Sequence, residues 1–365
     1  MVDESHEKNR IRSTASQTYQ APTSAAPFDL GLALWNQRHA AASVSERLSQ
    51  FFETLLTLQN PPVFLPEDYA KVFSIALEFQ PDIIVEFGRM YGNSTCALTE
   101  AACHLPRTKV VSACLSRAWF QKTLPSIQHL IDPRWLERLD ARVVNFFDLD
   151  VKSLLAEKER ILFVLDAHGW DVAEYFLGEV LPCMKNKHHI VLVHDIVLPD
   201  SFSQVHDRWF PEPQPHKMRS YQGRGIWKSN FDDQGTMQYL FANNLAGGYG
   251  EFVALIDFTL RNRVTLHSLE ASVRQTMDLI PEMQQELELL LGPTMCSPLS
   301  AYAWMTLNGT GESELEFPVF TRPKDNVPQG AEVLADLQRY NVRRKPTPLT
   351  FALLVAKSLM GRYRT

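Results

Sequence analysis

The sequence is poor in the features that mark secreted, membrane-spanning and metal-cluster proteins. Its 365 residues include five cysteines, none in a CxxC pair, which argues against a disulfide framework or a zinc cluster. The N-terminal stretch contains charges but lacks the apolar core of a secretory signal. Nowhere do about 18 uncharged apolar residues run together, as a membrane-spanning helix requires. We therefore expect a cytoplasmic protein without a membrane span.

The charge balance is modest. Lys and Arg number 36 and Asp and Glu number 42, so the net charge is −6 with His neutral. The chain has no long block of Lys or Arg, and non-specific nucleic-acid binding depends on neutralising many phosphates. The composition, with 45% hydrophobic residues, is that of a globular protein. A nucleic-acid partner is therefore not expected.

Four stretches differ in pattern. Residues 1–26 contain no Leu, Phe or Trp and predict a disordered tail. Residues 27–62 predict a helical extension, which Ser43 or Ser45 could cap and which ends at a Pro-Pro breaker. Residues 63–258 predict the main domain, and residues 259–365 a C-terminal extension of helices and late strands. The helical extension is indicated by apolar residues at helical spacing: Leu48, Phe51, Phe52, Leu55 and Leu56.

The main domain alternates short apolar runs with helix-like segments. The runs are apolar throughout, which indicates strands buried on both faces of a parallel sheet. Their alternation with helices predicts a doubly wound α/β fold. The expected strands are 82–86, 109–113, 141–144, 161–166 and 189–195, and the expected helices lie near 93–104, 117–130, 150–158 and 171–185. In the C-terminal extension, we expect a helical region over 266–291, broken at Pro281, and late strands at 301–307 and 317–320.

A glycine turn joins the first strand to a helix. The strand ends in Glu86, Gly88 and Gly92 follow, and Asn93, Ser94 or Thr95 opens the helix. Glycine lets a backbone approach a ligand closely, and a helix N-terminus offers N–H groups to an anion. In open α/β sheets, ligands bind in the crevice at the carboxyl ends of the strands. We therefore expect a binding site here, although the spacing is neither GxGxxG nor a Walker phosphate loop.

The stretch E-F-G-x-x-x-G-N-S-T resembles motif I of class I S-adenosylmethionine-dependent methyltransferases. The similarity is to the branch with cephalosporin-hydroxylase-like proteins and sugar O-methyltransferases of natural-product pathways. Further along, the segments 162–168 and 190–196 are similar to the D-A-H and H-D elements of that family. The resemblance covers roughly residues 66–200. It implies a Rossmann-like methyltransferase sheet, S-adenosylmethionine as cofactor, and methyl transfer to a hydroxyl of a small molecule or sugar.

The resemblance also implies roles for individual residues. Gly88 and Gly92 would cradle the methionine part of the cofactor, and Glu86 would orient it. Asp148 resembles the acid beside the adenine amino group. The family's acid for the ribose hydroxyls is missing, because Ala113 and Cys114 stand there; Ser112 or Ser116 could substitute. The cofactor-binding candidates are therefore Glu86, Gly88, Gly92, Asn93, Ser94, Asp148 and Asp166.

Two carboxylates are expected to face one crevice, because Asp166 and Asp195 end neighbouring strands. Oxygen ligands of this kind suit Mg²⁺, which would lower the pKa of a substrate hydroxyl while His168 or His194 takes its proton. In the alternative interpretation, each Asp caps a turn and each His orients it. Strand alternation would also place His194 on the face opposite Asp195.

Other functions stay open. A methyltransferase-fold protein that has lost catalysis and serves as a binding or scaffold module would account for Cys114 at the ribose position. A nicotinamide-dependent oxidoreductase is disfavoured by the absence of GxGxxG. The sequence leaves open the acceptor, the metal requirement and whether the chain forms a homo-oligomer. Residues 196–240 follow the fifth strand, and together with the N-terminal helix they are expected to set acceptor specificity.

Overall fold

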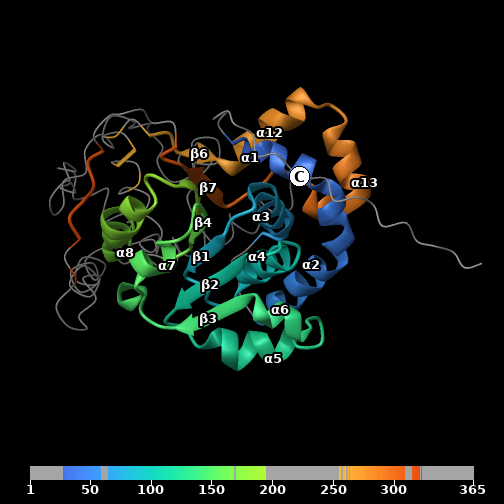
Figure 1. Cartoon of the computed structure of the whole chain (residues 1–365). Helices are drawn as coiled ribbons and strands as arrows, with labels where there is room; N and C mark the ends of the chain where they lie inside the picture. The colour runs from blue at the N-terminus through green and yellow to red at the C-terminus, as the bar shows by residue number, and fades with distance from the viewer. Residues whose placement is uncertain are drawn as a thin grey trace, which may run out of the picture.

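A seven-stranded sheet forms the centre of the protein in a computed structural model (Figure 1). The structure describes residues 28–58, 65–167, 170–194, 255, 258–259, 262, 264–308, 315–320 and 322. The strand order is β3-β2-β1-β4-β5-β7-β6. β1 to β5 pair in parallel, while β7 pairs antiparallel with β5 and β6. The strands are β1 Ile83–Phe87, β2 Lys109–Cys114, β3 Leu139–Val143, β4 Arg160–Leu165, β5 His188–His194, β6 His267–Ser268 and β7 Tyr302–Met305.

Helices cover both faces of the sheet, which confirms the predicted doubly wound α/β fold. On one face lie α1 (Leu30–Asn36), α2 (Arg38–Leu58), α3 (Pro66–Phe79), α4 (Asn93–Cys103), α12 (Leu269–Leu279) and α13 (Met283–Met295). The same layer holds η1 (Trp119–Thr123), α5 (Leu124–Ile127) and α6 (Pro133–Glu137). The other face is covered by η2 (Phe146–Asp148), α7 (Val151–Leu155), α8 (Trp170–Tyr175), η3 (Phe176–Val180) and η4 (Leu181–Cys183).

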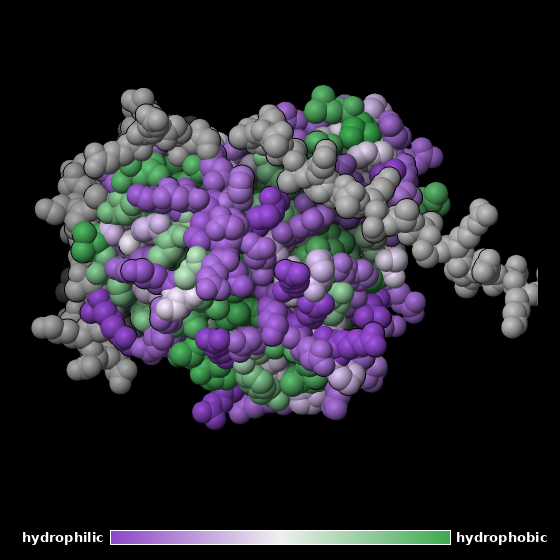
Figure 2. All heavy atoms as spheres, viewed as in Figure 1, coloured by the Kyte–Doolittle hydropathy of each residue, from purple (hydrophilic) through white to green (hydrophobic). Residues whose placement is uncertain are grey.

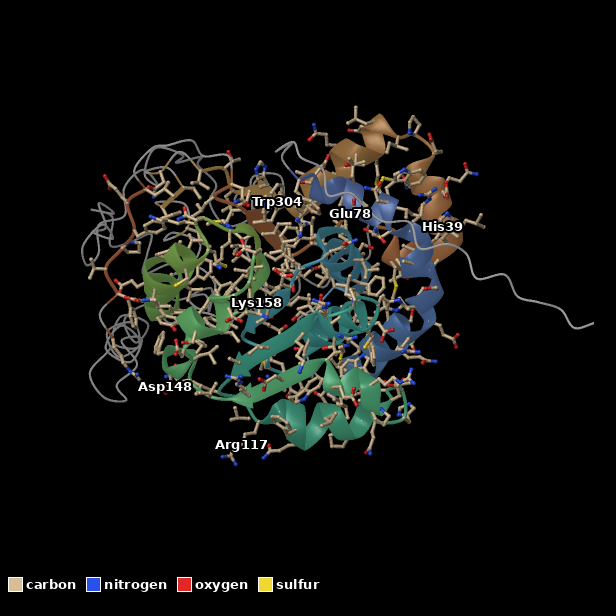
Figure 3. All side chains as sticks on the ribbon, viewed as in Figure 1. His39, Glu78, Arg117, Asp148, Lys158 and Trp304 are labelled. Atoms are coloured by element: carbon tan, nitrogen blue, oxygen red, sulfur yellow. The ribbon has the colours of Figure 1, made fainter. Side chains whose placement is uncertain are left out.

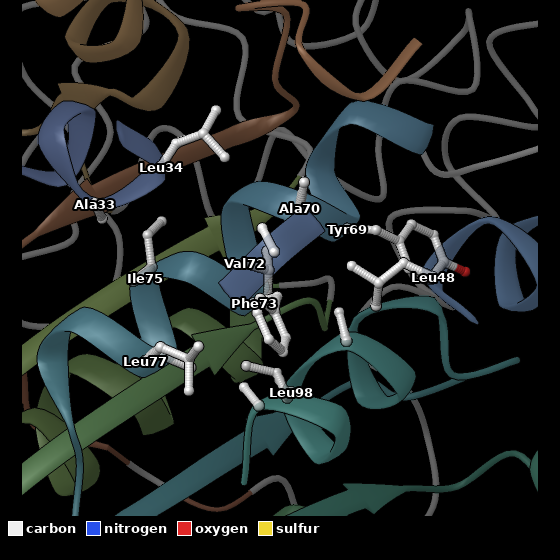
Figure 4. Close-up of a cluster of buried hydrophobic side chains, with 14 of the residues drawn as sticks. Ala33, Leu34, Leu48, Tyr69, Ala70, Val72, Phe73, Ile75, Leu77 and Leu98 are labelled. Atoms are coloured by element: carbon white, nitrogen blue, oxygen red, sulfur yellow. The ribbon is translucent and has the colours of Figure 1, made fainter. Parts of the chain in front are cut away.

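Strand alternation divides the core into two clusters. Along β1, Ile84 packs with the α1–α4 layer, and its neighbours Ile83 and Val85 pack with the α7–α8 layer. The α3 helix is buried along most of its length because α1, α2 and α4 surround it. Figure 4 shows this packing, in which Leu48 of α2 and Leu98 of α4 approach α3. Each Å² of apolar surface removed from water contributes about 25 cal/mol to stability. Burial of apolar side chains such as these is therefore the main term that stabilises the fold.

Helix α2 lies within the predicted helical extension and starts earlier than a cap at Ser43 or Ser45 predicts. Leu48, Phe51 and Leu55 are buried at helical spacing in α2. The helix begins at Arg38, so Ser43 and Ser45 lie inside it. Their hydroxyls donate to the carbonyls of Ala40 and Ala42. The predicted serine cap is therefore wrong, because the helical pattern extends further toward the N-terminus than the apolar stripe alone indicates.

The C-terminal extension contributes to the same sheet as the main domain. The expected helical region is present as α12 and α13, and β7 lies within the expected strand 301–307. The second expected strand is wrong, because residues 317–320 have no strand structure; Phe317 and Phe320 instead pack against the α7–α8 core. Boundaries between the four predicted stretches stay predictions. The tail 1–26 and the loop 196–240 lie outside the described residues.

The described surface is mostly hydrophilic on the face in Figure 2. Apolar side chains gather at the corner formed by α12 and α13, where Leu279 and Leu289 are exposed. Within the described part of the chain, no helix is long and apolar enough to cross a bilayer.

Candidate functional site

Three residues align at the carboxyl ends of the central strands. Phe87 of β1 lies opposite Ala113 of β2 and Leu165 of β4, so Gly88, Cys114 and Asp166 follow side by side. The Gly88 N–H donates to the Ala113 carbonyl at 3.0 Å, and the Asp166 N–H donates to the Phe87 carbonyl at 2.8 Å. We call these three residues the carboxyl edge.

The carboxyl edge lies where the strand order reverses. From β1 the chain proceeds to β2 and β3 on one side and to β4 and β5 on the other. Open α/β sheets bind ligands at such a switch point. Gly88, Cys114 and Asp166 are all partly exposed, so they are available to a ligand.

Beneath the edge, Glu86 is held in a network of hydroxyls. Its carboxylate accepts hydrogen bonds from Ser94 Oγ at 2.5 Å, from Thr95 Oγ1 at 2.6 Å and from Ser112 Oγ. These four residues, Glu86, Ser94, Thr95 and Ser112, are the inner hydroxyl network, and all of them are buried. Burial raises the pKa of Glu86, while the three hydroxyls and the Arg89 charge lower it. The network ties the end of β1 to α4 and β2, so Glu86 acts on the conformation of the glycine turn.

Both glycines of the turn are required by protein packing. Gly88 has φ +100°, and a Cβ there would lie 1.8 Å from the Asp166 carbonyl oxygen. Gly92 has φ +90°, and a Cβ there would lie 2.4 Å from ring atoms of Trp119. The space beside each glycine is thus filled by another part of the chain. Contact of Gly88 or Gly92 with a cofactor is a separate prediction.

The N-terminus of α4 has no side-chain cap. Its N-cap residue is Gly92, which adopts a left-handed conformation and makes no side-chain hydrogen bond. The first N–H groups of a helix have no partner within the helix and carry partial positive charge. The Asn93 side chain is turned away from this role, because its Oδ1 accepts from the Tyr69 hydroxyl at 2.8 Å.

Asp166 and His194 form a pair across β4 and β5. His194 Nδ1 lies 3.0 Å from Asp166 Oδ1. The His194 side chain is 3% exposed, and that of Asp166 is 19% exposed, so the carboxylate reaches solvent and the imidazole lies behind it. The structure therefore brings two of the sequence-predicted residues into contact.

Tyr302 joins this pair from β7. Its ring centroid lies 4.8 Å from that of His194, and the two residues are directly opposite in the antiparallel pairing. Burial raises the pKa of Tyr302 well above its usual value; the charges of Asp166, Asp68 and Glu86 raise it further, and a Ser94 hydrogen bond lowers it. Tyr302 thus lies between the His194 pair and the inner hydroxyl network.

On the β2 side lie Arg89 and Cys114, the latter at the position where the resemblance predicts an acid. Arg89 is 2% exposed, and its guanidinium donates to the Ser112 and Arg142 carbonyls. The Cys114 sulfur accepts from the backbone N–H groups of Met90 and Ser116, each at 3.4 Å. The suggested substitutes are engaged elsewhere: Ser112 bonds Glu86, and the Ser116 hydroxyl accepts from the Ala118 N–H.

Asp148 lies away from this cluster, at the surface. It ends the short helix η2 beyond β3, and Figure 3 shows it at the periphery of the molecule. Its side chain is 48% exposed and accepts a hydrogen bond from Arg322. The adenine role of Asp148 stays a prediction.

Two predicted residues cannot be placed. His168 and Asp195 lie outside the described residues, so their roles as base and metal ligand stay predictions. Within the ranges that the structure describes, no three His, Cys, Asp or Glu side chains are arranged to hold a metal ion.

Sequence reasoning missed three buried residues near the site: Arg89, Asp68 and Tyr302. Arg89 lies within the glycine motif at one of the positions where the motif specifies no residue, so the motif does not indicate a role for it. Asp68 accepts from the Ser300 hydroxyl at 2.6 Å and the Ala301 N–H at 3.1 Å. These contacts join α3 to the segment before β7, more than 200 residues away in the chain, and no local pattern could reveal them.

No protein-family model and no curated protein sequence matches the chain. Solved structures with a similar backbone path include a methyltransferase of Podospora anserina bound to S-adenosylhomocysteine, with 14% identity over 67% of this chain and 93% of that chain and a TM-score of 0.37. An O-methyltransferase of Bacillus cereus in complex with S-adenosylhomocysteine has 15% identity over 49% of this chain and 89% of its own, with a TM-score of 0.32. An O-methyltransferase of Streptomyces achromogenes involved in tomaymycin synthesis has 17% identity over 46% of this chain and 79% of its own, with a TM-score of 0.31. The functional interpretation therefore depends on this chain's own carboxyl edge.

Proposed function

We propose that the protein is an S-adenosylmethionine-dependent methyltransferase that acts on a hydroxyl of a small molecule. The observation that carries the proposal is the meeting of three features at the switch point of the sheet, beside the carboxyl edge: the glycine turn, a partly exposed Asp166 paired with His194, and the uncapped N-terminus of α4. This is where a doubly wound sheet binds its ligand.

The charges at the edge fit the amino-acid part of the cofactor. A carboxylate is favoured at the N-terminus of α4, where N–H groups and the helix dipole both attract an anion. An ammonium group is favoured beside Asp166, whose carboxylate reaches solvent. On the β2 side, Met90 and Leu115 are 53% and 66% exposed and offer apolar surface to a nucleoside. When bound, S-adenosylmethionine supplies an electrophilic methyl group.

The chain's own contribution to chemistry is the Asp166–His194 pair. Asp166 Oδ1 lies 3.0 Å from His194 Nδ1, and because the His194 ring is buried behind the carboxylate, we assign His194 the role of holding Asp166 at the crevice. Proton uptake from the acceptor hydroxyl by His168 or His194 stays a prediction. A general base positioned at the acceptor hydroxyl would contribute roughly 10²–10⁴-fold to the proton transfer. The inner hydroxyl network has a positioning role, because it is buried below the residues that reach solvent. Assistance by Mg²⁺ through Asp166 and Asp195 is a prediction that the same experiment addresses.

The test is calorimetric titration of S-adenosylhomocysteine into the wild-type protein, with and without Mg²⁺, followed by Asp166→Asn. We expect wild-type binding and at least a tenfold loss in Asp166→Asn, since a charge-assisted contact is worth roughly 1.5–3 kcal/mol. Asp140→Asn is the matched control, because Asp140 is an exposed acid on β3 that pairs with Arg142. Circular dichroism checks that both variants fold.

Absence of wild-type binding under either condition would contradict the proposal and favour the scaffold alternative. Equal losses in Asp166→Asn and Asp140→Asn would contradict the specific role of Asp166. Binding that requires Mg²⁺ would support the predicted metal role, and binding unaffected by Mg²⁺ would count against it. Methyl transfer to a hydroxyl acceptor panel then tests turnover.

A further inference from the structure

Two charged side chains of α3, Asp68 and Lys71, are buried and hold the segment that leads into β7. The Asp68 carboxylate accepts hydrogen bonds from the Ser300 hydroxyl at 2.6 Å and from the Ala301 N–H at 3.1 Å. Lys71 Nζ donates to the Leu299 carbonyl at 2.7 Å. One turn of α3 thus holds three successive residues of a distant segment. We call these five residues the β7 clamp.

The β7 clamp leads directly to the residue that faces His194. The Ser300 hydroxyl that donates to Asp68 also accepts from the Tyr302 N–H at 3.2 Å, and Tyr302 is the first residue of β7. Tyr302 lies opposite His194 in the strand pairing, with the ring centroids 4.8 Å apart. His194 Nδ1 in turn lies 3.0 Å from Asp166 Oδ1. A continuous chain of contacts therefore joins Asp68 to the carboxylate at the crevice.

The charged groups along this chain of contacts act on one another. Burial raises the pKa of Asp68, while the charge of Lys71, the hydrogen bonds from Ser300 and Ala301 and the charge of His194 lower it. Burial lowers the pKa of Lys71 to about 8, so its ammonium group is still mostly charged at neutral pH. Asp68 is therefore close enough to His194 for each to affect the charge of the other.

Stability alone does not account for the charged groups of the β7 clamp. Removing a carboxylate and an ammonium group from water is costly, and apolar side chains of similar volume often stabilise a fold equally well. A buried polar network in which each group has its partner specifies one geometry, because any shift breaks a hydrogen bond. The clamp therefore suits a segment whose exact position matters.

We propose that Asp68 is a positioning residue for the Asp166–His194 pair. Asp68 fixes Ser300 and through it Tyr302, and Tyr302 holds the His194 ring beside the Asp166 carboxylate. The inference rests on the proposed function, because that function assigns the pair to the ligand-binding crevice. It makes β7, which comes from the C-terminal extension, a working part of the site.

The first test compares Asp68→Asn with Glu78→Gln as the matched control. Glu78 lies on the same helix and also accepts two hydrogen bonds, but its donors are Asn36 and Gln37 at the end of α1. In calorimetry, we expect Asp68→Asn to bind S-adenosylhomocysteine roughly 3–10-fold more weakly than the wild type, as the loss of one hydrogen bond commonly does. Glu78→Gln should stay within about twofold, as substitutions away from a site usually do.

A second measurement reports on position and not on stability. In protein containing isotope-labelled histidine, nuclear magnetic resonance gives the ring signals of His194, which are assigned by their loss in His194→Gln. At one fixed pH, Asp68→Asn should shift these signals and Glu78→Gln should leave them unchanged. Ser300→Ala should reproduce the shift, and it serves in place of Asp68→Asn if that variant folds poorly. Ser300→Thr, which keeps the hydroxyl, should retain the wild-type signals.

The outcomes separate this inference from the proposed function. If the wild type does not bind S-adenosylhomocysteine, the proposed function fails, and the His194 signals still decide whether Asp68 positions the pair. If the wild type binds and Asp68→Asn loses no more affinity than Glu78→Gln, the positioning role alone is overturned. Unchanged His194 signals in Asp68→Asn and Ser300→Ala would also overturn it, because the clamp would then have no effect on the ring.

Discussion

Replacing Gly88 by alanine tests the close approach of β1 and β4 at the carboxyl edge. A Cβ at this position would lie 1.8 Å from the Asp166 oxygen, 2.3 Å from its carbonyl carbon and 2.8 Å from the Ala167 nitrogen. All three are backbone atoms, so relief requires the end of β4 to move. Gly292→Ala is the matched control, because its φ is +80° and nothing lies within 4 Å of the added Cβ.

The expected magnitudes follow from two terms. A residue other than glycine at positive φ costs roughly 1–3 kcal/mol, and both variants carry a term of this kind. Only Gly88→Ala also meets a clash, which adds about 1–3 kcal/mol as in other overpacked sites. We expect Gly292→Ala to lose about 1–3 kcal/mol and Gly88→Ala about 2–6 kcal/mol of unfolding free energy.

The assay is equilibrium unfolding in urea followed by far-ultraviolet circular dichroism. Gly92→Ala gives an intermediate case, since its clash is with the side chain of Trp119, which can move more easily than backbone. If Gly88→Ala proves no less stable than Gly292→Ala, the packing of Gly88 against Asp166 is refuted. A shifted edge should also weaken S-adenosylhomocysteine binding in Gly88→Ala, but not in Gly292→Ala.

Three further predictions concern buried polar groups. Glu86→Ala should lose at least about 2 kcal/mol more than Glu86→Gln in urea unfolding, because three buried hydroxyls lose their acceptor; equal losses would contradict the network. Burial lowers the pKa of His189 below 6.5 in the folded protein. The contribution of the neutral His189 side chain to the free energy of unfolding is therefore complete above pH 6.5, and it is lost as the pH falls through the lowered pKa. His189→Gln should flatten that acid-side loss, and an unchanged pH profile would refute the assignment. Burial lowers the pKa of Lys71 from 10.5 to about 8, so wild-type stability should rise between these pH values by at most ~3 kcal/mol, and Lys71→Met should remove the rise.

The sheet was predictable because its signals are local. Apolar runs such as 161–166 and 189–195 show directly in the sequence, and their spacing with helices leaves few topologies. The observed β4 and β5 begin and end within one residue of those expectations. Both strands end at the same edge because parallel strands do so, and this placed Asp166 beside His194 in the structure.

The late strands show where local signals end. The run 301–307 became β7 because it pairs with β5, while 317–320, equally apolar, packs through Phe317 and Phe320 into the α7–α8 core without a strand partner. Apolar character decides burial. Whether an apolar run forms a strand depends on whether the edge of a neighbouring strand is free to pair with it, and the rest of the fold decides this.

The sequence alone determined the alternation of strands and helices, the glycine turn after Glu86 and the acid at the end of β4. These follow from hydrophobic periodicity and from backbone conformations that only glycine adopts easily. Tertiary structure alone decided that Trp119 fills the space beside Gly92, that Tyr302 lies opposite His194, and that Arg89 and Cys114 share one corner. Such contacts join segments far apart in the chain, and their energies depend on packing and desolvation that exist only once the chain has folded.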